Sequence, residues 1–168
     1  FIPWHTQAYY LEYQRTKDAD YADFIFEMSD WLLSMQQVRS PQYADVAGRF
    51  YDPKRPKFGT PHSSSTGVYI EGLIDAWALA KELGDTTRQE TYRVALVRGL
   101  RNVMQFTYLH EDEAFYALEP ALAVGGVRTA SYNTVVRCDN VQHNLMGILK
   151  IIQRFAPEDY VHPPHPES

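Results

Sequence analysis

Two kinds of helical pattern alternate along this chain, and their alternation limits the folds it can adopt. Hydrophobic residues repeat at three- and four-residue spacing over residues 20–35 and 85–106, with polar residues opposite, which predicts helices that bury one face. Residues 65–83 and 141–152 are apolar almost all the way round, as in helices buried on most sides. A weaker helix is predicted from Pro3 to about Lys17.

The connections between the predicted helices differ in length. Two are short, at residues 17–20 and 83–85, where Gly84 suits a left-handed helix C-cap and Asp85 suits the start of the next helix. Short connections require antiparallel neighbours. Two are long, at residues 38–64 and 110–137, and loops of that length in a compact domain usually have a function. Because both enter inner helices, we expect the polar first turns of those helices to gather at one end.

The helices therefore follow the order inner, outer, inner, outer, inner. Successive hairpins of this kind are the pattern of an α/α toroid, in which parallel inner helices are wrapped by outer ones. The alternative is a three-helix or four-helix bundle. We predict an all-α domain over residues 1–156, made of antiparallel helix hairpins that form part of an α/α toroid. A Pro-rich tail is predicted over residues 157–168.

Three phrases of the sequence resemble hairpins of the six-hairpin-glycosidase-like superfamily of α/α toroids. They are STGVYIEGL at residues 65–73, AKELGD at 80–85, and GGVR at 125–128 leading to RCDNVQH at 137–143. The resemblance implies a carbohydrate-active domain, since the superfamily contains glycoside hydrolases, polysaccharide lyases and sugar epimerases. It also implies a sugar held in a cup formed by loops at one end of the barrel.

A full toroid has six hairpins, whereas this chain offers about two and a half. An open ring would expose apolar flanks larger than monomers usually leave bare. We therefore expect a dimer or a covalent neighbour. The chain begins with Phe1 rather than Met, which also predicts that it is part of a longer protein.

Composition restricts the partners of the chain. The net charge is −5 and the arginines are scattered instead of forming a basic stripe, so nucleic acid is not expected to bind. No apolar stretch reaches the roughly 20 residues that a membrane span needs. The single cysteine, Cys138, excludes an internal disulfide and leaves the compartment, cytoplasmic or periplasmic, open.

Asp139 and His143 are the first candidates for proton transfer. They lie four residues apart, so on a helix the carboxylate could orient the imidazole, as a general base requires. The alternative is structural: Asp139 caps the helix, and His143 is packed and hydrogen-bonded.

Glu71 is the third catalytic candidate. It lies in the first turns of a mostly apolar helix, where burial favours the protonated acid that a general acid needs. Two structural explanations of Glu71 are also open: an ion pair with Arg128 or Arg137, or a wet seam, that is, a row of polar side chains in contact with water, which it would share with Asp75.

The candidate substrate-binding residues are polar or aromatic side chains at the inner-helix starts and in the long loops. Arginines beside aromatic rings bind carboxylated sugars through bidentate contacts and stacking, although each taken alone could be a solvated loop charge. These candidates are Trp4, His5, Arg49, His62, Tyr69, Arg128, Tyr132, Arg137 and Gln142. We therefore expect a carbohydrate, in particular an acidic sugar or polysaccharide, as the partner.

Two other functions stay open at this stage. One is a noncatalytic helical module that docks onto another domain or subunit. The other is a zinc-dependent toroid enzyme that uses Cys138, Asp139 and His143, although no recognisable zinc motif is present. We predict neither a metal nor a cofactor.

Overall fold

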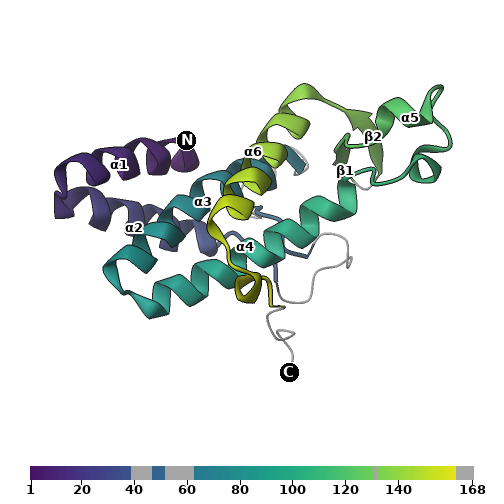
Figure 1. The fold of residues 1–168 in the computed structure, drawn as a ribbon. Coiled ribbons are helices and arrows are strands. Elements are labelled where there is room, and N and C mark those ends of the chain that lie inside the picture. The colour runs from purple at the N-terminus through teal and green to yellow at the C-terminus, as the bar shows by residue number, and fades with distance from the viewer. Residues whose placement is uncertain (39–46, 52–62, 131, 162–168) are drawn as a thin grey trace.

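The computed structural model describes residues 1–38, 47–51, 63–130 and 132–161, and helices dominate them (Figure 1). The long helices are α1 (Ile2–Thr16), α2 (Ala19–Leu33), α3 (Ser63–Leu83), α4 (Thr86–Phe106) and α6 (Cys138–Arg154). The short elements are η3 (Glu111–Ala114), α5 (Pro120–Ala123), β1 (Arg128–Ala130), β2 (Asn133–Val136) and η4 (Pro157–Tyr160). The predicted all-α class is confirmed.

Two tight turns make the predicted antiparallel hairpins. After α1, Lys17 adopts a left-handed conformation with φ of 57°, and Asp18 caps α2 by accepting a hydrogen bond from the Asp20 amide. After α3, Gly84 has φ of 73°, and the Asp85 side chain accepts a hydrogen bond from the Arg88 amide. Both turns hold their helices side by side.

The helices form two layers around α3. In Figure 1, α1, α3 and α6 run in roughly the same direction, and α2 and α4 run the opposite way beneath them. The central helix α3 packs against α1, α4 and α6. Its side chains Ile70, Leu73, Ile74 and Trp77 are at most 1% exposed. The prediction that α3 is buried on most sides is therefore confirmed.

The same expectation is wrong for α6. One face of α6 packs on α3, but Leu145, Met146, Leu149 and Ile152 are between 42% and 61% exposed. In the described part of the chain, no outer helix lies over this face of α6, as α2 and α4 do for the other inner helices.

Glycines let the inner helices approach α3 closely. A β-carbon built on Gly72 would lie 2.8 Å from the carbonyl oxygen of Pro3 and closer still to its Cα. A β-carbon on Gly67 would lie 2.7 Å from the backbone nitrogen of Asn144. At both crossings the obstacle includes main chain, which cannot rotate aside.

We therefore expect Gly72→Ala to lower the free energy of unfolding by about 1–3 kcal/mol through overpacking, even though alanine is the better helix former. Urea denaturation measures the change. Gly147→Ala is the graded comparison: its new methyl group would lie 2.7 Å from Cγ1 of the buried Ile70 but 3.3 Å from the nearest backbone atom, the Gly67 oxygen, so we expect a smaller loss. A Gly72→Ala protein as stable as the parent would contradict the close approach.

Residues 107–136 leave the helical layers and form a projecting tip, seen at the right of Figure 1. The strands β1 and β2 pair antiparallel, and an isolated bridge joins Thr107 to Val127 at the base. The tip carries acidic side chains and exposed apolar ones, and no Lys or Arg lies between residues 111 and 127. The segment predicted to be a long loop, residues 110–137, therefore contains short helices and a pair of strands.

The chain after α6 returns to the helical layers. The Phe155 ring packs against Trp77 at 4.9 Å and against Tyr160 at 5.3 Å between centroids. Arg93 donates hydrogen bonds to the carbonyl oxygens of Asp159 and Val161. Residues 157–161 of the predicted tail thus pack on α4.

Among the described residues, no helix has the length and apolar character needed to cross a membrane.

Candidate functional site

A row of polar side chains lies between the inner helices, and we call it the polar seam. Its two carboxylates, Glu71 and Asp75, are one turn apart on α3, and they are 6% and 3% exposed. Buried carboxylates need partners, because desolvation of an unpaired charge is costly. The partners come from α1 and α6, and the complete seam consists of Gln7, Glu71, Asp75, His143, Lys150 and Arg154.

The Glu71 half of the seam joins three helices. Glu71 Oε1 accepts a hydrogen bond from Gln7 Nε2 of α1 at 3.1 Å, and Glu71 Oε2 lies 3.1 Å from His143 Nδ1 of α6. The ring of Trp4, from the first turn of α1, lies 6.0 Å from the His143 ring. Trp4 is 45% exposed, so an aromatic surface open to solvent adjoins a carboxylate–imidazole pair.

The Asp75 half is a buried ion-pair cluster. Lys150 and Arg154 both pair with the Asp75 carboxylate. Lys150 also donates to the backbone oxygen of Glu71 at 2.7 Å, and Arg154 donates to that of Ile74 at 3.0 Å. The seam thus contains two acidic and two basic side chains, and their mutual pairing lowers the cost of burying them together.

The structure does not form the predicted Asp139–His143 pair. Both oxygens of Asp139 instead accept hydrogen bonds from Arg137, at 2.9 and 3.0 Å. Partial desolvation opposes ionisation of Asp139, but the hydrogen bonds and charge of Arg137 outweigh it and lower the pKa of this carboxyl. The carboxylate that contacts His143 is Glu71, which arrives from another helix.

Of the alternatives raised for Glu71, the seam shared with Asp75 is the one that forms, but it is buried and not wet. Arg137 is occupied by Asp139. Arg128 donates to the backbone oxygen of Gln105 at 2.7 Å, and its guanidinium lies over aromatic rings of the tip base. Neither arginine is a hydrogen-bond partner of Glu71.

The predicted substrate-binding residues on the inner helices separate into two groups. Trp4 joins the Glu71–His143 pair. His5 instead stacks on Phe1 at 6.5 Å and contacts the Tyr9 ring at 6.0 Å. Tyr69 points to the other side of α3, where its ring lies 5.3 Å from Phe50. Gln142 is exposed on α6.

The predicted loop residues do not gather around Glu71 either. Arg49 donates to Gln37 Oε1 at 2.6 Å and lies over the Tyr51 ring. Tyr132 is 70% exposed in the turn between β1 and β2. His62 lies outside the described residues.

Four seam residues were not singled out from the sequence as functional candidates: Gln7, Asp75, Lys150 and Arg154. A signal for some of them was present. Glu71 and Asp75 are four residues apart in an apolar helix, and Lys150 and Arg154 are four apart in another. Two charged pairs of opposite sign and equal spacing fit a shared helix–helix interface.

Within the described part of the chain, no three His, Cys, Asp or Glu side chains are close enough together to hold a metal ion. The arrangement that a zinc-dependent enzyme would need from Cys138, Asp139 and His143 is therefore not formed. Cys138 is exposed at the first position of α6, and Asp139 is paired with Arg137.

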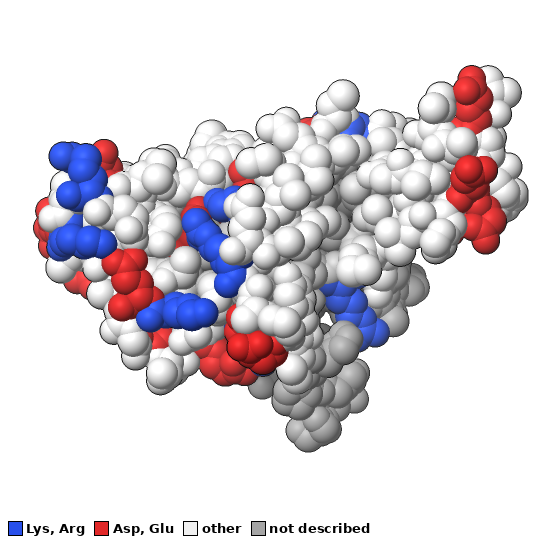
Figure 2. Space-filling view, viewed as in Figure 1, with Lys and Arg blue, Asp and Glu red and all other residues white. Residues whose placement is uncertain are grey.

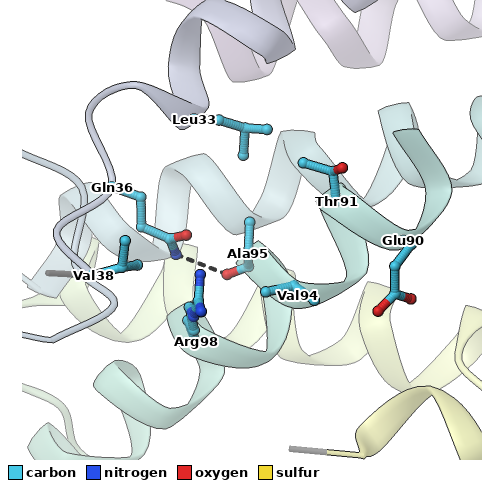
Figure 3. Close-up of a pocket in the computed structure, with 8 residues that line it drawn as sticks. All are labelled: Leu33, Gln36, Val38, Glu90, Thr91, Val94, Ala95 and Arg98. Carbon is cyan, nitrogen blue, oxygen red and sulfur yellow. Dashed lines mark hydrogen bonds between the residues drawn. The ribbon is translucent and has the colours of Figure 1, made fainter. Parts of the chain in front are cut away.

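A pocket of 330 Å³ lies in the outer layer, between the end of α2, the following turn and α4 (Figure 3). Across it, Gln36 Nε2 donates to the backbone oxygen of Ala95 at 2.8 Å. Burial lowers the pKa of the Arg98 guanidinium, which also lines the pocket. None of the sequence-predicted site residues contributes to this pocket, whose lining is Leu33, Gln36, Val38, Glu90, Thr91, Val94, Ala95 and Arg98.

Comparisons with protein-family models, with curated proteins and with solved structures give no match.

Proposed function

We propose that this chain is the carbohydrate-processing or carbohydrate-binding part of an α/α-toroid protein, and that Trp4, Glu71 and His143 form its sugar site. The observation that carries the proposal is the convergence of these three side chains from α1, α3 and α6. An open aromatic face beside a carboxylate–imidazole pair combines a surface for a sugar ring with groups that transfer protons. The resemblance to toroid hairpins supports the same class.

Each side chain has a distinct role in this proposal. The indole of Trp4 stacks on the apolar face of a sugar ring. Glu71 orients the imidazole through Nδ1, which directs Nε2 toward the bound sugar. The pair then donates or removes the proton that hydrolysis, elimination or epimerisation requires.

The proposal specifies an acidic sugar. A protonated His143 attracts a carboxylate, and the nearby start of α6 adds partial positive charge. The N-cap residue Arg137 makes no capping hydrogen bond, and the carboxylate beside the first amides of α6 is that of Asp139. Arg137 itself remains 53% exposed at the side chain and can bind a carboxylate alongside Asp139.

We expect Trp4→Ala to weaken the binding of a uronic-acid oligosaccharide by about 1–2 kcal/mol, or roughly 5- to 30-fold. The reason is the loss of the stacking surface. Isothermal titration with a panel of uronic-acid oligosaccharides measures the change, and neutral glucose oligomers of the same length test the requirement for charge. Trp31→Ala is the matched control, because Trp31 is 50% exposed on α2, away from the seam. Equal losses in the two variants, or no binding by the parent, would contradict the site.

One observation favours a second function, that of a noncatalytic docking module. The exposed apolar face of α6 is unusual for a helix that carries site residues. A docking role and a sugar site are compatible, because the face of α6 that reaches the seam differs from the exposed one.

A further inference from the structure

The projecting tip exposes large apolar side chains. Phe115, Leu118 and Leu122 are 78%, 98% and 78% exposed. They lie in the part of the tip where η3 and α5 pack against each other. Single exposed apolar residues are ordinary on a protein surface, whereas several within one small unit are typical of an interaction site.

The backbone that carries these side chains is held in place. The Tyr108 amide donates a hydrogen bond to the Gly126 oxygen at 2.9 Å, and the Gly125 amide donates to the Tyr108 oxygen at 2.8 Å. The Ala117 amide donates to the Ala114 oxygen at 2.8 Å, and Ala114 is 1% exposed. The tip thus presents its apolar side chains on an ordered support, which lowers the entropy lost when a partner binds.

Acidic side chains flank the exposed apolar ones. Glu111 and Asp112 lie in the first turn of η3, and Glu119 is the N-cap residue of α5. None of these three carboxylates forms an ion pair with another residue that the structure describes. By contrast, Asp85 at the start of α4 pairs with Arg88. The carboxylates of the tip are therefore available to a partner.

The tip has no basic side chain to balance these charges. The sequence contains no Lys or Arg from residue 102 to residue 127. The next one along the chain, Arg128 in β1, donates to the backbone oxygen of Gln105 at the base of the tip. Figure 2 shows acidic side chains on the tip and no basic ones beside them. Charge complementarity thus favours a partner that supplies positive charge.

We propose that the tip docks onto a basic amphipathic segment of another protein, in which Lys or Arg side chains flank aliphatic ones. The apolar contacts supply most of the affinity, and the carboxylates select the partner by its charge. The same carboxylates repel nucleic acid, an anionic lipid surface and the tip of a second copy. A basic amphipathic helix presents both kinds of side chain close together.

Fluorescence anisotropy with a labelled peptide of Leu and Lys, patterned as an amphipathic helix, tests the proposal. We expect a dissociation constant of roughly 1–100 μM, as for a small interface. It should rise about 5-fold or more between about 50 and 500 mM salt, because exposed charges are screened. Two comparison peptides, one with Glu in place of Lys and one with Ser in place of Leu, should bind at least about 10-fold more weakly.

Two sets of substitutions in the tip separate apolar contact from charge. Leu118→Ser should raise the dissociation constant at least about 10-fold, as the loss of a central apolar contact does. Combined replacement of the three acids by their amides, Glu111→Gln, Asp112→Asn and Glu119→Gln, should have a similar effect and should abolish most of the salt dependence. All four side chains are exposed, so circular dichroism and the unfolding midpoint should not change.

Matched controls make the same changes elsewhere on the surface. Combined Asp20→Asn, Asp23→Asn and Glu27→Gln removes the same charge from exposed positions of α2. Leu11→Ser removes a leucine that is 69% exposed on α1. Both controls should bind the peptide within about twofold of the parent, because neither lies in the tip.

Three results would overturn the proposal. One is the absence of saturable binding of the Leu–Lys peptide at about 1 mM. Another is an equal loss of affinity in the tip and control variants, which would show only a general attraction to an acidic protein. The third is binding of the Glu-containing peptide, or of vesicles of phosphatidylcholine or phosphatidylserine, that is as tight and that Leu118→Ser weakens equally. The tip would then recognise apolar surfaces or lipid without regard to charge.

Discussion

Replacing Asp75 with asparagine should lower the free energy of unfolding by about 3–5 kcal/mol, the cost of breaking a buried ion pair from one side. Asp75 is 3% exposed and pairs with both Lys150 and Arg154. Asparagine keeps the size of the side chain but removes its charge, so two cations remain close together at a partly desolvated interface. Since small domains are stable by only about 5–15 kcal/mol, urea denaturation should show a large shift.

Two further variants separate charge from packing. Glu82→Gln changes another carboxylate of α3 that is paired with Lys17 near the protein surface, and it should leave the unfolding midpoint nearly unchanged. Lys150→Met added to Asp75→Asn should recover part of the lost stability, because it removes one of the two uncompensated cations. If Asp75→Asn is as stable as Glu82→Gln, the buried ion pairs are not what holds α6 on α3.

Glu71→Gln should reduce turnover of the bound oligosaccharide about 100-fold or more, while leaving its affinity nearly unchanged. General acid–base assistance is typically worth 10²–10⁴-fold, and glutamine retains the shape of Glu71 but has no carboxylate to pair with the imidazole in proton transfer. The substrate is the uronic-acid oligosaccharide that binds best in the titration. Hydrolysis is followed by new reducing ends, elimination by the absorbance of the unsaturated product, and epimerisation by proton exchange with solvent.

Asp139→Asn is the decisive comparison for this prediction. It removes the other carboxylate that sequence reasoning had placed with His143, but that carboxylate pairs with Arg137 in the structure. Turnover lost in Asp139→Asn and kept in Glu71→Gln would show that the Glu71–His143 pair is not the catalytic one. If Glu71→Gln and His143→Ala only lower the melting temperature, without any effect on sugar binding or turnover, both residues are structural.

The helices could be predicted from the sequence because their signals are local. Spacing of apolar residues identified all five long helices, and Gly84 and Asp85 identified the α3–α4 turn. The burial of Asn102 could not be predicted from such local signals. The spacing of apolar residues places Asn102 opposite the apolar stripe of α4, on the side that would face solvent. In the structure it is 1% exposed, and the Thr66 hydroxyl of α3 donates to its Oδ1 at 3.3 Å.

The candidate site could be predicted only in part. Periodicity placed Trp4, Glu71 and His143 on inner helices, but it could not choose between Asp139 and Glu71 as the partner of His143. The choice depends on how α6 is rotated against α3, which close contacts such as Gly67 against Asn144 determine. Periodicity also could not distinguish α3 from α6, because an all-round apolar pattern does not say which neighbours are present to cover it.

The central position of α3 has a consequence for the order of folding. The α1–α2 and α3–α4 hairpins close over short turns, whereas Glu71 and His143 are separated by 72 positions along the chain. Contacts between distant segments pay a larger loop-closure entropy and generally form later. We therefore expect α6 to dock onto preformed hairpins, so that any intermediate with α6 undocked contains most of the hydrophobic core but lacks every seam contact that His143, Lys150 and Arg154 make.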